Sequence, residues 1–112
     1  MKEYKIDLQA YRTPTAKVFT GRPHGLKVRN ESKIDIIAGQ YDKITVVIPK
    51  DISSINPSFL EEFLENVVKE LGENGFLKKF SFENEGRYKI DTDLTEAIER
   101  ILREENALSF QE

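Results

Sequence analysis

The sequence predicts an α/β fold with a mixed, largely parallel sheet of four to five strands and about three helices packed on it. Residues 44–48 form a short apolar run rich in β-branched side chains, which is typical of a strand covered on both faces. Residues 58–71 and 94–102 repeat apolar side chains at helical spacing. Strands and helices also alternate along the chain, which favours parallel pairing through right-handed crossovers.

Two strands are expected before the first helix. Apolar and charged side chains alternate over residues 3–8, which predicts a half-buried strand. Residues 9–17 contain a proline between two threonines and are expected to form a loop or a sheet edge. A second short strand is expected over residues 18–20.

The first helix is predicted over residues 26–38, ending at Gly39. The preceding tract, 21–25, contains two glycines and a proline, so it is expected to form a turn or the start of a helix. The apolar residues that can share one face of this helix are Leu26, Ile34 and Ile37. Residues 34–37 could instead be extended, so the sequence leaves both conformations open for this segment.

The second half of the chain predicts helix, strand, turn and helix. The helix over 58–71 is expected to end at Gly72, and a strand is expected around residues 79–82. Phe76 and Leu77 are assigned to the same strand region, with a turn at 84–86. The last helix is predicted to begin at a cap and to bury an apolar stripe over residues 94–102. The two cap candidates are Thr92 and Asp93, and the tail residues expected to dock are Leu108 and Phe110.

Length and composition exclude several classes of protein. A chain of 112 residues fits one domain, 1–112, and can bury one real core. The net charge of -3 argues against a general nucleic-acid binder. There is no cysteine and only one histidine, His24, which excludes disulfides, thiol catalysis and zinc sites built on cysteine.

The chain is expected to be a cytoplasmic protein that does not enter the membrane. No run approaches the roughly 18 apolar residues of a membrane span, and residues 1–9 lack the apolar core of a signal peptide.

The segment from Asp51 to Glu62 is the main candidate for function. It joins the carboxyl end of the buried strand to the start of the strongest helix, and ligands of open α/β sheets bind at that edge. Two capping arrangements are open: Asn56 as N-cap with Pro57 in the first position, or Ser58 as N-cap with Glu61 completing a capping box. The hydroxyl of Ser58 either only satisfies backbone donors or also lies at a binding surface.

The order of strand, loop, serine at a helix start and apolar helix resembles the STAS domain of anti-sigma factor antagonists. The closer resemblance is to the bacterial STAS-like domain family of unknown function, and it covers about residues 18–102. Its motifs are Arg22-x-x-Gly25-x-x-x-Arg29, Val46-Val47-Ile48 and Ile55-x-x-Ser58-Phe59-Leu60-x-Glu62.

The resemblance implies a non-catalytic regulatory module for signalling that binds a GHKL-type ATPase or kinase. The residues implied in partner binding are Ser58, Asn56, Phe59 and Glu62, with Ser58 a candidate for phosphorylation. The chain departs from the STAS pattern, Asp-Ser-Ser-Gly, because it has Asn56-Pro57-Ser58-Phe59 there. Phe59 is therefore expected to obstruct the approach of a kinase. A homodimer is left open.

An alternative function is the binding of a small molecule or nucleotide at Arg22, Arg29 and the helix start at Ser58. These two arginines could instead anchor the chain by pairing with acidic residues or carbonyl groups. His24 lies in a Gly/Pro turn and has no acid placed beside it by the sequence, so no catalytic residue is assigned. No metal ligand and no cofactor is assigned either; Asp91, Asp93 and Glu96 are ordinary complements to a helix dipole.

Overall fold

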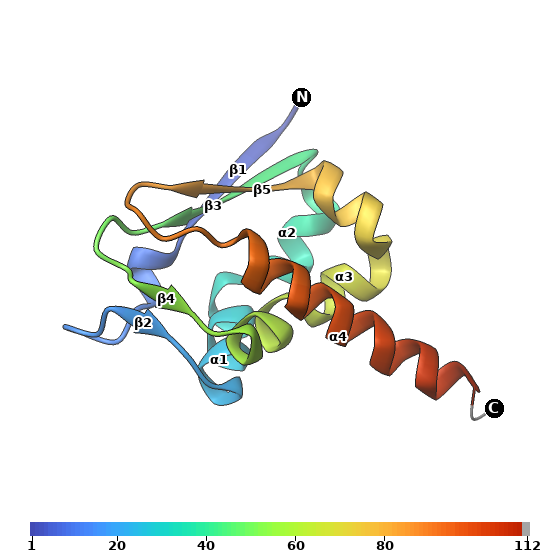
Figure 1. Cartoon of the computed structure of the whole chain (residues 1–112). Helices are drawn as coiled ribbons and strands as arrows, with labels where there is room; N and C mark the ends of the chain where they lie inside the picture. The colour runs from blue at the N-terminus through green and yellow to red at the C-terminus, as the bar shows by residue number, and fades with distance from the viewer. Residues whose placement is uncertain (111–112) are drawn as a thin grey trace.

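The computed structural model describes the backbone of residues 1–110 and the side chains of residues 1–105. It confirms an α/β protein in which strands and helices alternate. The elements, shown in Figure 1, are β1 (Glu3–Asp7), the 3-10 helix η1 (Leu8–Tyr11), β2 (Val18–Phe19), α1 (Arg22–Ser32), α2 (Ile34–Gln40), β3 (Lys43–Ile48), β4 (Ser54–Ile55), α3 (Pro57–Lys79), β5 (Phe80–Asn84) and α4 (Asp91–Phe110). No helix in this part of the chain is long and apolar enough to cross a membrane.

In the described part of the chain, five strands form two small sheets instead of one sheet of four to five strands. The larger sheet has the order β1-β3-β5 with parallel pairing throughout, and β2 pairs in parallel with β4 in a separate two-stranded sheet. Proline has no N–H for a ladder, so β3 ends before Pro49. The turn that follows leads the chain to β2, where Ser53 and Asn56 donate backbone hydrogen bonds to the carbonyl groups of Lys17 and Phe19.

The larger sheet is covered by helices on one face, the lower face in Figure 1. Ile6, Val46 and Phe80 are buried on that side. On the other side Lys5 forms an ion pair of 3.7 Å with Glu83, across the intervening strand β3. The prediction that the central strand is covered on both faces is therefore only partly right, because Thr45 on this side is half-buried. It holds only near its carboxyl end, where η1 packs against β3 and Val47 is buried.

The region predicted as one helix over 26–38 contains two helices. Lys33 adopts the left-handed conformation with φ of 58° and separates α1 from α2. Helix α1 already begins at Arg22, because Pro23 suits the first turn of a helix. Ile34 and Ile37 are buried as expected, but Leu26 is 39% exposed and does not share their face.

Gly72 ends the first straight part of α3, as predicted, with φ of 72°. The chain then returns to a helix as far as Lys79, so Phe76 and Leu77 lie in that helix and not in a strand. Strand β5 begins at Phe80. Phe76 remains fully buried and stacks on Phe80 with ring centroids 4.7 Å apart.

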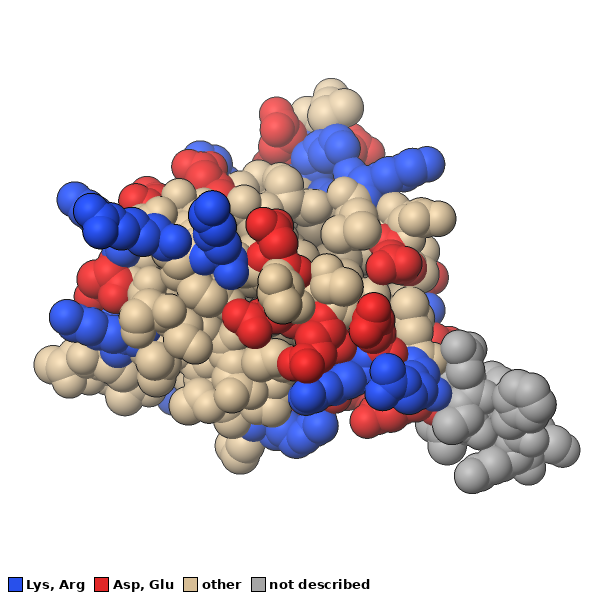
Figure 2. Space-filling model, viewed as in Figure 1, with Lys and Arg blue, Asp and Glu red and all other residues tan. Residues whose placement is uncertain are grey.

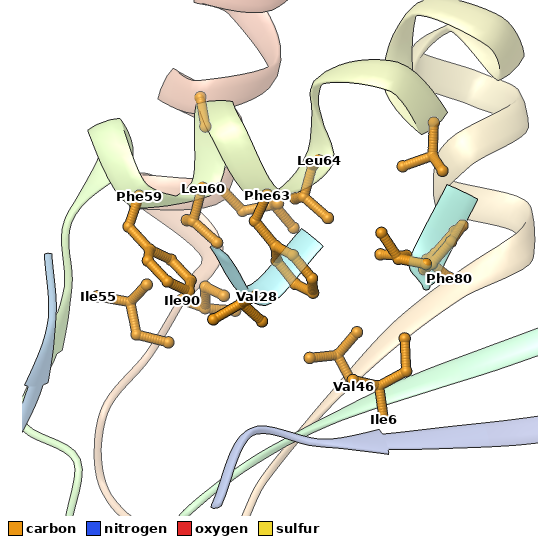
Figure 3. Packing of buried hydrophobic residues seen from close by; sticks show 14 of the residues in the cluster. Ile6, Val28, Val46, Ile55, Phe59, Leu60, Phe63, Leu64, Phe80 and Ile90 are labelled. Carbon is orange, nitrogen blue, oxygen red and sulfur yellow. The ribbon is translucent and has the colours of Figure 1, made fainter. Parts of the chain in front are cut away.

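One hydrophobic core joins the sheet to the helices (Figure 3). Helix α3 contributes seven side chains to this core, more than any other element, and it packs against both α1 and α4. The apolar stripe of the last helix is confirmed by buried Leu94, Ala97, Ile98 and Ile101. Helix α4 starts at Asp91, before both predicted caps. The expected docking of Leu108 and Phe110 concerns side chains outside the described residues.

Candidate functional site

The loop between β3 and α3 is held by an ion pair that links it to the N-terminal part of the chain. The guanidinium of Arg12 donates to both carboxylate oxygens of Asp51, at 2.7 and 3.0 Å, and to the carbonyl oxygen of Ala16. This hydrogen bond with Arg12 holds the pKa of Asp51 below its usual value. Two parallel bonds fix the direction as well as the distance of the pair, so the loop approaches the start of α3 in a defined conformation.

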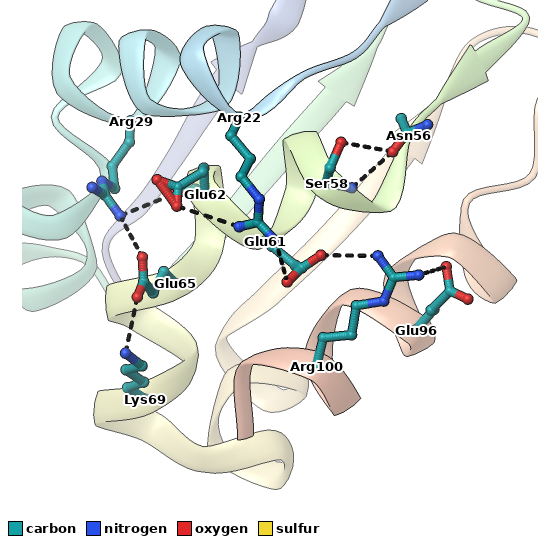
Figure 4. Close-up of polar contacts among 10 residues, drawn as sticks. All are labelled: Arg22, Arg29, Asn56, Ser58, Glu61, Glu62, Glu65, Lys69, Glu96 and Arg100. Atoms are coloured by element: carbon teal, nitrogen blue, oxygen red, sulfur yellow. Dashed lines mark hydrogen bonds and ion pairs between the residues drawn. The ribbon is translucent and has the colours of Figure 1, made fainter. Parts of the chain in front are cut away.

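Asn56 is the N-cap of α3. Its side-chain oxygen accepts hydrogen bonds from the backbone N–H of Ser58 at 2.9 Å and from the Ser58 hydroxyl at 2.8 Å (Figure 4). Pro57 follows in the first helical position. Of the two arrangements that the sequence left open, the Asn56 cap is therefore correct and the capping box of Ser58 with Glu61 is wrong. Ser58 lies in the first turn and is half-buried.

Asn56→Ala should lower the free energy of unfolding by about 1 kcal/mol, because it removes the acceptor that satisfies an unpaired N–H of α3. Ser58→Ala should cost less than about 0.5 kcal/mol, since its hydroxyl contributes no bond to the helix backbone. Urea denaturation measures both values. Asn56→Asp is the matched control and should stay close to the wild type, because the carboxylate keeps the acceptor. A larger loss for Ser58→Ala than for Asn56→Ala would contradict the assignment of the cap.

Gly25 is the point at which α1 crosses α3. A Cβ atom there would collide with the carbonyl oxygen of Phe59 and lie 2.9 Å from the Cβ of Glu62. Only a glycine allows the two helices to approach so closely. The arginines of the motif Arg22-x-x-Gly25-x-x-x-Arg29 lie one turn before and one turn after this contact, so both reach across α3.

Both arginines bind acidic groups of α3 (Figure 4). Arg22 contacts Glu61 at 3.2 Å, and Arg29 contacts Glu65 at 3.3 Å and donates to the carbonyl oxygen of Glu62 at 2.9 Å. Lys69 is the second partner of Glu65, and its hydrogen bond, followed by that of Arg29, holds the pKa of Glu65 below its usual value. The anchoring role that the sequence left open for these arginines is thus the one they have here.

Glu61 joins three helices. Its carboxylate is buried, 3% exposed, and lies between Arg22 of α1 and Arg100 of α4, the latter at 3.0 Å. Arg100 in turn contacts Glu96 at 3.3 Å. A buried carboxylate needs such partners, because loss of hydration without compensation is costly. The start of α3 is therefore fixed on both sides, by α1 and by α4.

The predicted partner-binding residues do not all reach the surface. Asn56 is exposed, and Ser58 and Glu62 are half-buried on the same two turns. Phe59 is fully buried, with its ring 5.2 Å from that of Phe19. The expectations that Phe59 contacts a partner and obstructs a kinase are both wrong, because it lies on the core face of α3.

His24 and the acidic residues of α4 have structural contacts. The Nε2 of His24 lies 2.9 Å from the carbonyl oxygen of Tyr11, so this nitrogen carries the hydrogen, and the ring stacks on Phe19. Asp93 accepts a hydrogen bond of 2.5 Å from the hydroxyl of Tyr88, and burial, with this contact, raises the pKa of that hydroxyl. No group of three metal-ligating side chains is present among the described residues.

Several residues of this site gave no usable signal in the sequence. The partners Arg12, Arg100 and Tyr88 lie at least 33 residues from some of the groups they bind. The sequence does mark Glu61, because this acidic residue lies among the apolar residues of α3 that are expected to face the core. At the start of α3 the hydroxyl of the half-buried Ser58 therefore donates to the exposed Asn56, on a helix that ion pairs fix to α1 and α4. A fixed surface of this kind suits recognition of another molecule.

Comparison of the chain with family models, with curated proteins and with solved structures gave no match. The function is therefore inferred from the residues and contacts described above.

Proposed function

We propose that the protein is a non-catalytic regulatory module, similar to the STAS-like domains of anti-sigma factor antagonists, that binds a GHKL-type ATPase or kinase through the start of α3. The observation that carries this proposal is the position of Ser58. Its hydroxyl lies in the first turn of a helix that is held by two neighbouring helices, beside the exposed Asn56 and the half-buried Glu62.

A rigid surface favours this role, because binding to it orders few additional groups. Glu61 holds α3 against α1 and α4, so a partner meets a helix start whose geometry is already set. Arg22 is 53% exposed on its side chain and Glu62 adjoins it at 3.8 Å. These groups supply both charge signs at the edge of the surface, which favours selection among partners.

Phosphorylation of Ser58 fits the local structure. A phosphate in the first turn is stabilised by the partial positive charge and the N–H groups of a helix start. Phe59 points into the core and leaves the hydroxyl unobstructed by its ring. The added charge of about -1.5 to -2 would then lie within the surface that meets the partner.

The second candidate function, an anion or nucleotide site at Arg22, Arg29 and Ser58, has less support. Both guanidinium groups already contact carboxylates of α3 at 3.2 and 3.3 Å. An added anion would have to displace these carboxylates, and Glu61 would then be left buried with one partner fewer.

Ser58→Asp should weaken binding to the GHKL-type ATPase at least tenfold, while Ser58→Ala should bind within about threefold of the wild type, since an added charge must be desolvated at the interface. Isothermal titration calorimetry with purified ATPases of this class from the same genome measures the affinities. The matched control is Asn74→Asp, which adds the same charge at an exposed position beyond Gly72.

Equal affinity for the wild type and both Ser58 variants would refute the proposal that phosphorylation of Ser58 controls partner binding. An interface that leaves Asn56, Ser58 and Glu62 uncovered would refute the proposed surface.

A further inference from the structure

A depression of about 440 Å³ lies at the carboxyl edge of the larger sheet, between the loops that follow β3 and β5. Its lining residues are Lys50, Asp51, Ile52, Ser53, Gly86, Arg87 and Tyr88. Ligands of open parallel sheets bind outside the carboxyl ends of the strands, and this volume is within the range of sites for small molecules. None of the lining residues belongs to the surface formed by Asn56, Ser58 and Glu62.

The two loops that form the depression are tied together. A Cβ atom at Gly86 would collide with the carbonyl group of Lys50, so the backbones are in direct contact there. The N–H of Glu85 donates to the carbonyl oxygen of Ile48 at 3.2 Å, and the N–H of Gly86 donates to the Asn84 side chain at 2.9 Å. Lys50 and Arg87 are therefore carried on a common, braced backbone, one on each loop.

The charge of the lining is positive. Asp51 is neutralised by Arg12, which donates to both of its carboxylate oxygens. Lys50 and Arg87 are exposed, and neither forms an ion pair with any residue whose side chain the structure describes. Figure 2 shows Lys and Arg side chains projecting over the loops at the left, with a few acidic side chains between them, whereas acidic side chains concentrate over α4.

The rest of the lining is less polar. Ile52 is 3% exposed, and Tyr88 is held in place because its hydroxyl donates to Asp93 and lies 3.2 Å from the carbonyl oxygen of Ile55. The depression thus combines two exposed cations with an aliphatic side chain and an aromatic ring. A phosphate suits the cations, because arginine binds it through two parallel hydrogen bonds and lysine through its charge. The organic part of a phosphate ester suits the two less polar side chains, Ile52 and Tyr88.

We propose that this depression binds a small phosphomonoester, with Lys50 and Arg87 on the phosphate and Ile52 and Tyr88 against the organic group. Calorimetry at low ionic strength should give AMP and ribose 5-phosphate a Kd below about 1 mM. Inorganic phosphate should bind at least fivefold more weakly than AMP, and adenosine should not bind. Lys50→Met and Arg87→Gln should each weaken AMP at least tenfold. The matched controls, Lys78→Met and Arg103→Gln, remove the same charges from exposed positions elsewhere and should leave the affinity unchanged.

The proposal is overturned if neither ester binds, if inorganic phosphate binds as tightly as AMP, or if the control variants weaken AMP as much as the site variants. A phosphoserine peptide that binds at least tenfold more tightly than ribose 5-phosphate would assign the site to a modified protein and overturn the small-molecule ligand. Ser58→Asp should leave AMP binding unchanged, so failure of this site is distinguishable from failure of the partner-binding surface.

Discussion

Gly25→Ala should lower the free energy of unfolding by about 3 kcal/mol, which is a large part of the 5–15 kcal/mol that stabilises a typical domain. The new methyl group would meet the backbone carbonyl of Phe59, which cannot rotate away as a side chain can. Helices α1 and α3 must therefore separate, and the contacts of Arg22 with Glu61 and of Arg29 with Glu65 lengthen with them. Urea denaturation, followed by circular dichroism, measures the loss.

The matched control is Gly39→Ala in α2, where a Cβ atom would meet nothing within 4 Å. Alanine is the better helix former, so this variant should be more stable than the wild type by about 0.5–1 kcal/mol. Equal stability for the two alanine variants would contradict the close crossing of α1 and α3.

Phe59→Ala should lower the free energy of unfolding by about 3–5 kcal/mol, because it leaves a cavity in a packed core. The Phe59 ring has no exposed surface and lies 5.2 to 5.8 Å, between ring centroids, from Phe19, His24 and Phe63. Thermal and urea denaturation give the size of the loss. Leu77→Ala removes another large apolar side chain from α3, but one that is 49% exposed, and should change stability by less than about 0.5 kcal/mol.

A Phe59→Ala variant that kept its stability and lost only partner binding would contradict this placement. It would return Phe59 to the surface where the resemblance to STAS-like domains had placed it.

The elements that could be predicted are those in which the spacing of apolar residues fits only one kind of secondary structure. Strand β3 is apolar and β-branched, and the first part of α3 repeats apolar residues over several turns, so both appear within two residues of their expected limits. The break between α1 and α2 had no glycine to mark it, because a lysine, Lys33, takes the left-handed conformation. The sequence also favours a strand at Phe76 and Leu77, because a short apolar run has no period that distinguishes a strand from a helix.

The candidate site was predictable only in its local part. Capping by Asn56 with Pro57 depends on neighbouring residues and is one of the two arrangements that the sequence allows. The roles of Arg22 and Arg29 depend on how α1 crosses α3, and this crossing is set by a contact between Gly25 and a segment more than thirty residues away. The prediction that Phe59 lies at the surface is wrong for the same reason. To place Phe59 correctly, one must know which face of α3 the neighbouring helices cover.

The spatial order of the larger sheet, β1-β3-β5, is also the order in which its strands leave the ribosome. Each new strand can therefore be added at the same growing edge, and no strand has to be inserted between two that are already paired. Every addition must nevertheless wait for the intervening crossover, since Glu3 pairs with Lys43 and Ile44 with Phe80. Pairings of such long sequence separation are slow to form. During synthesis β1 and β3 can pair before α3 is available, and for that interval the part of their apolar face that α3 later covers is exposed to chaperones.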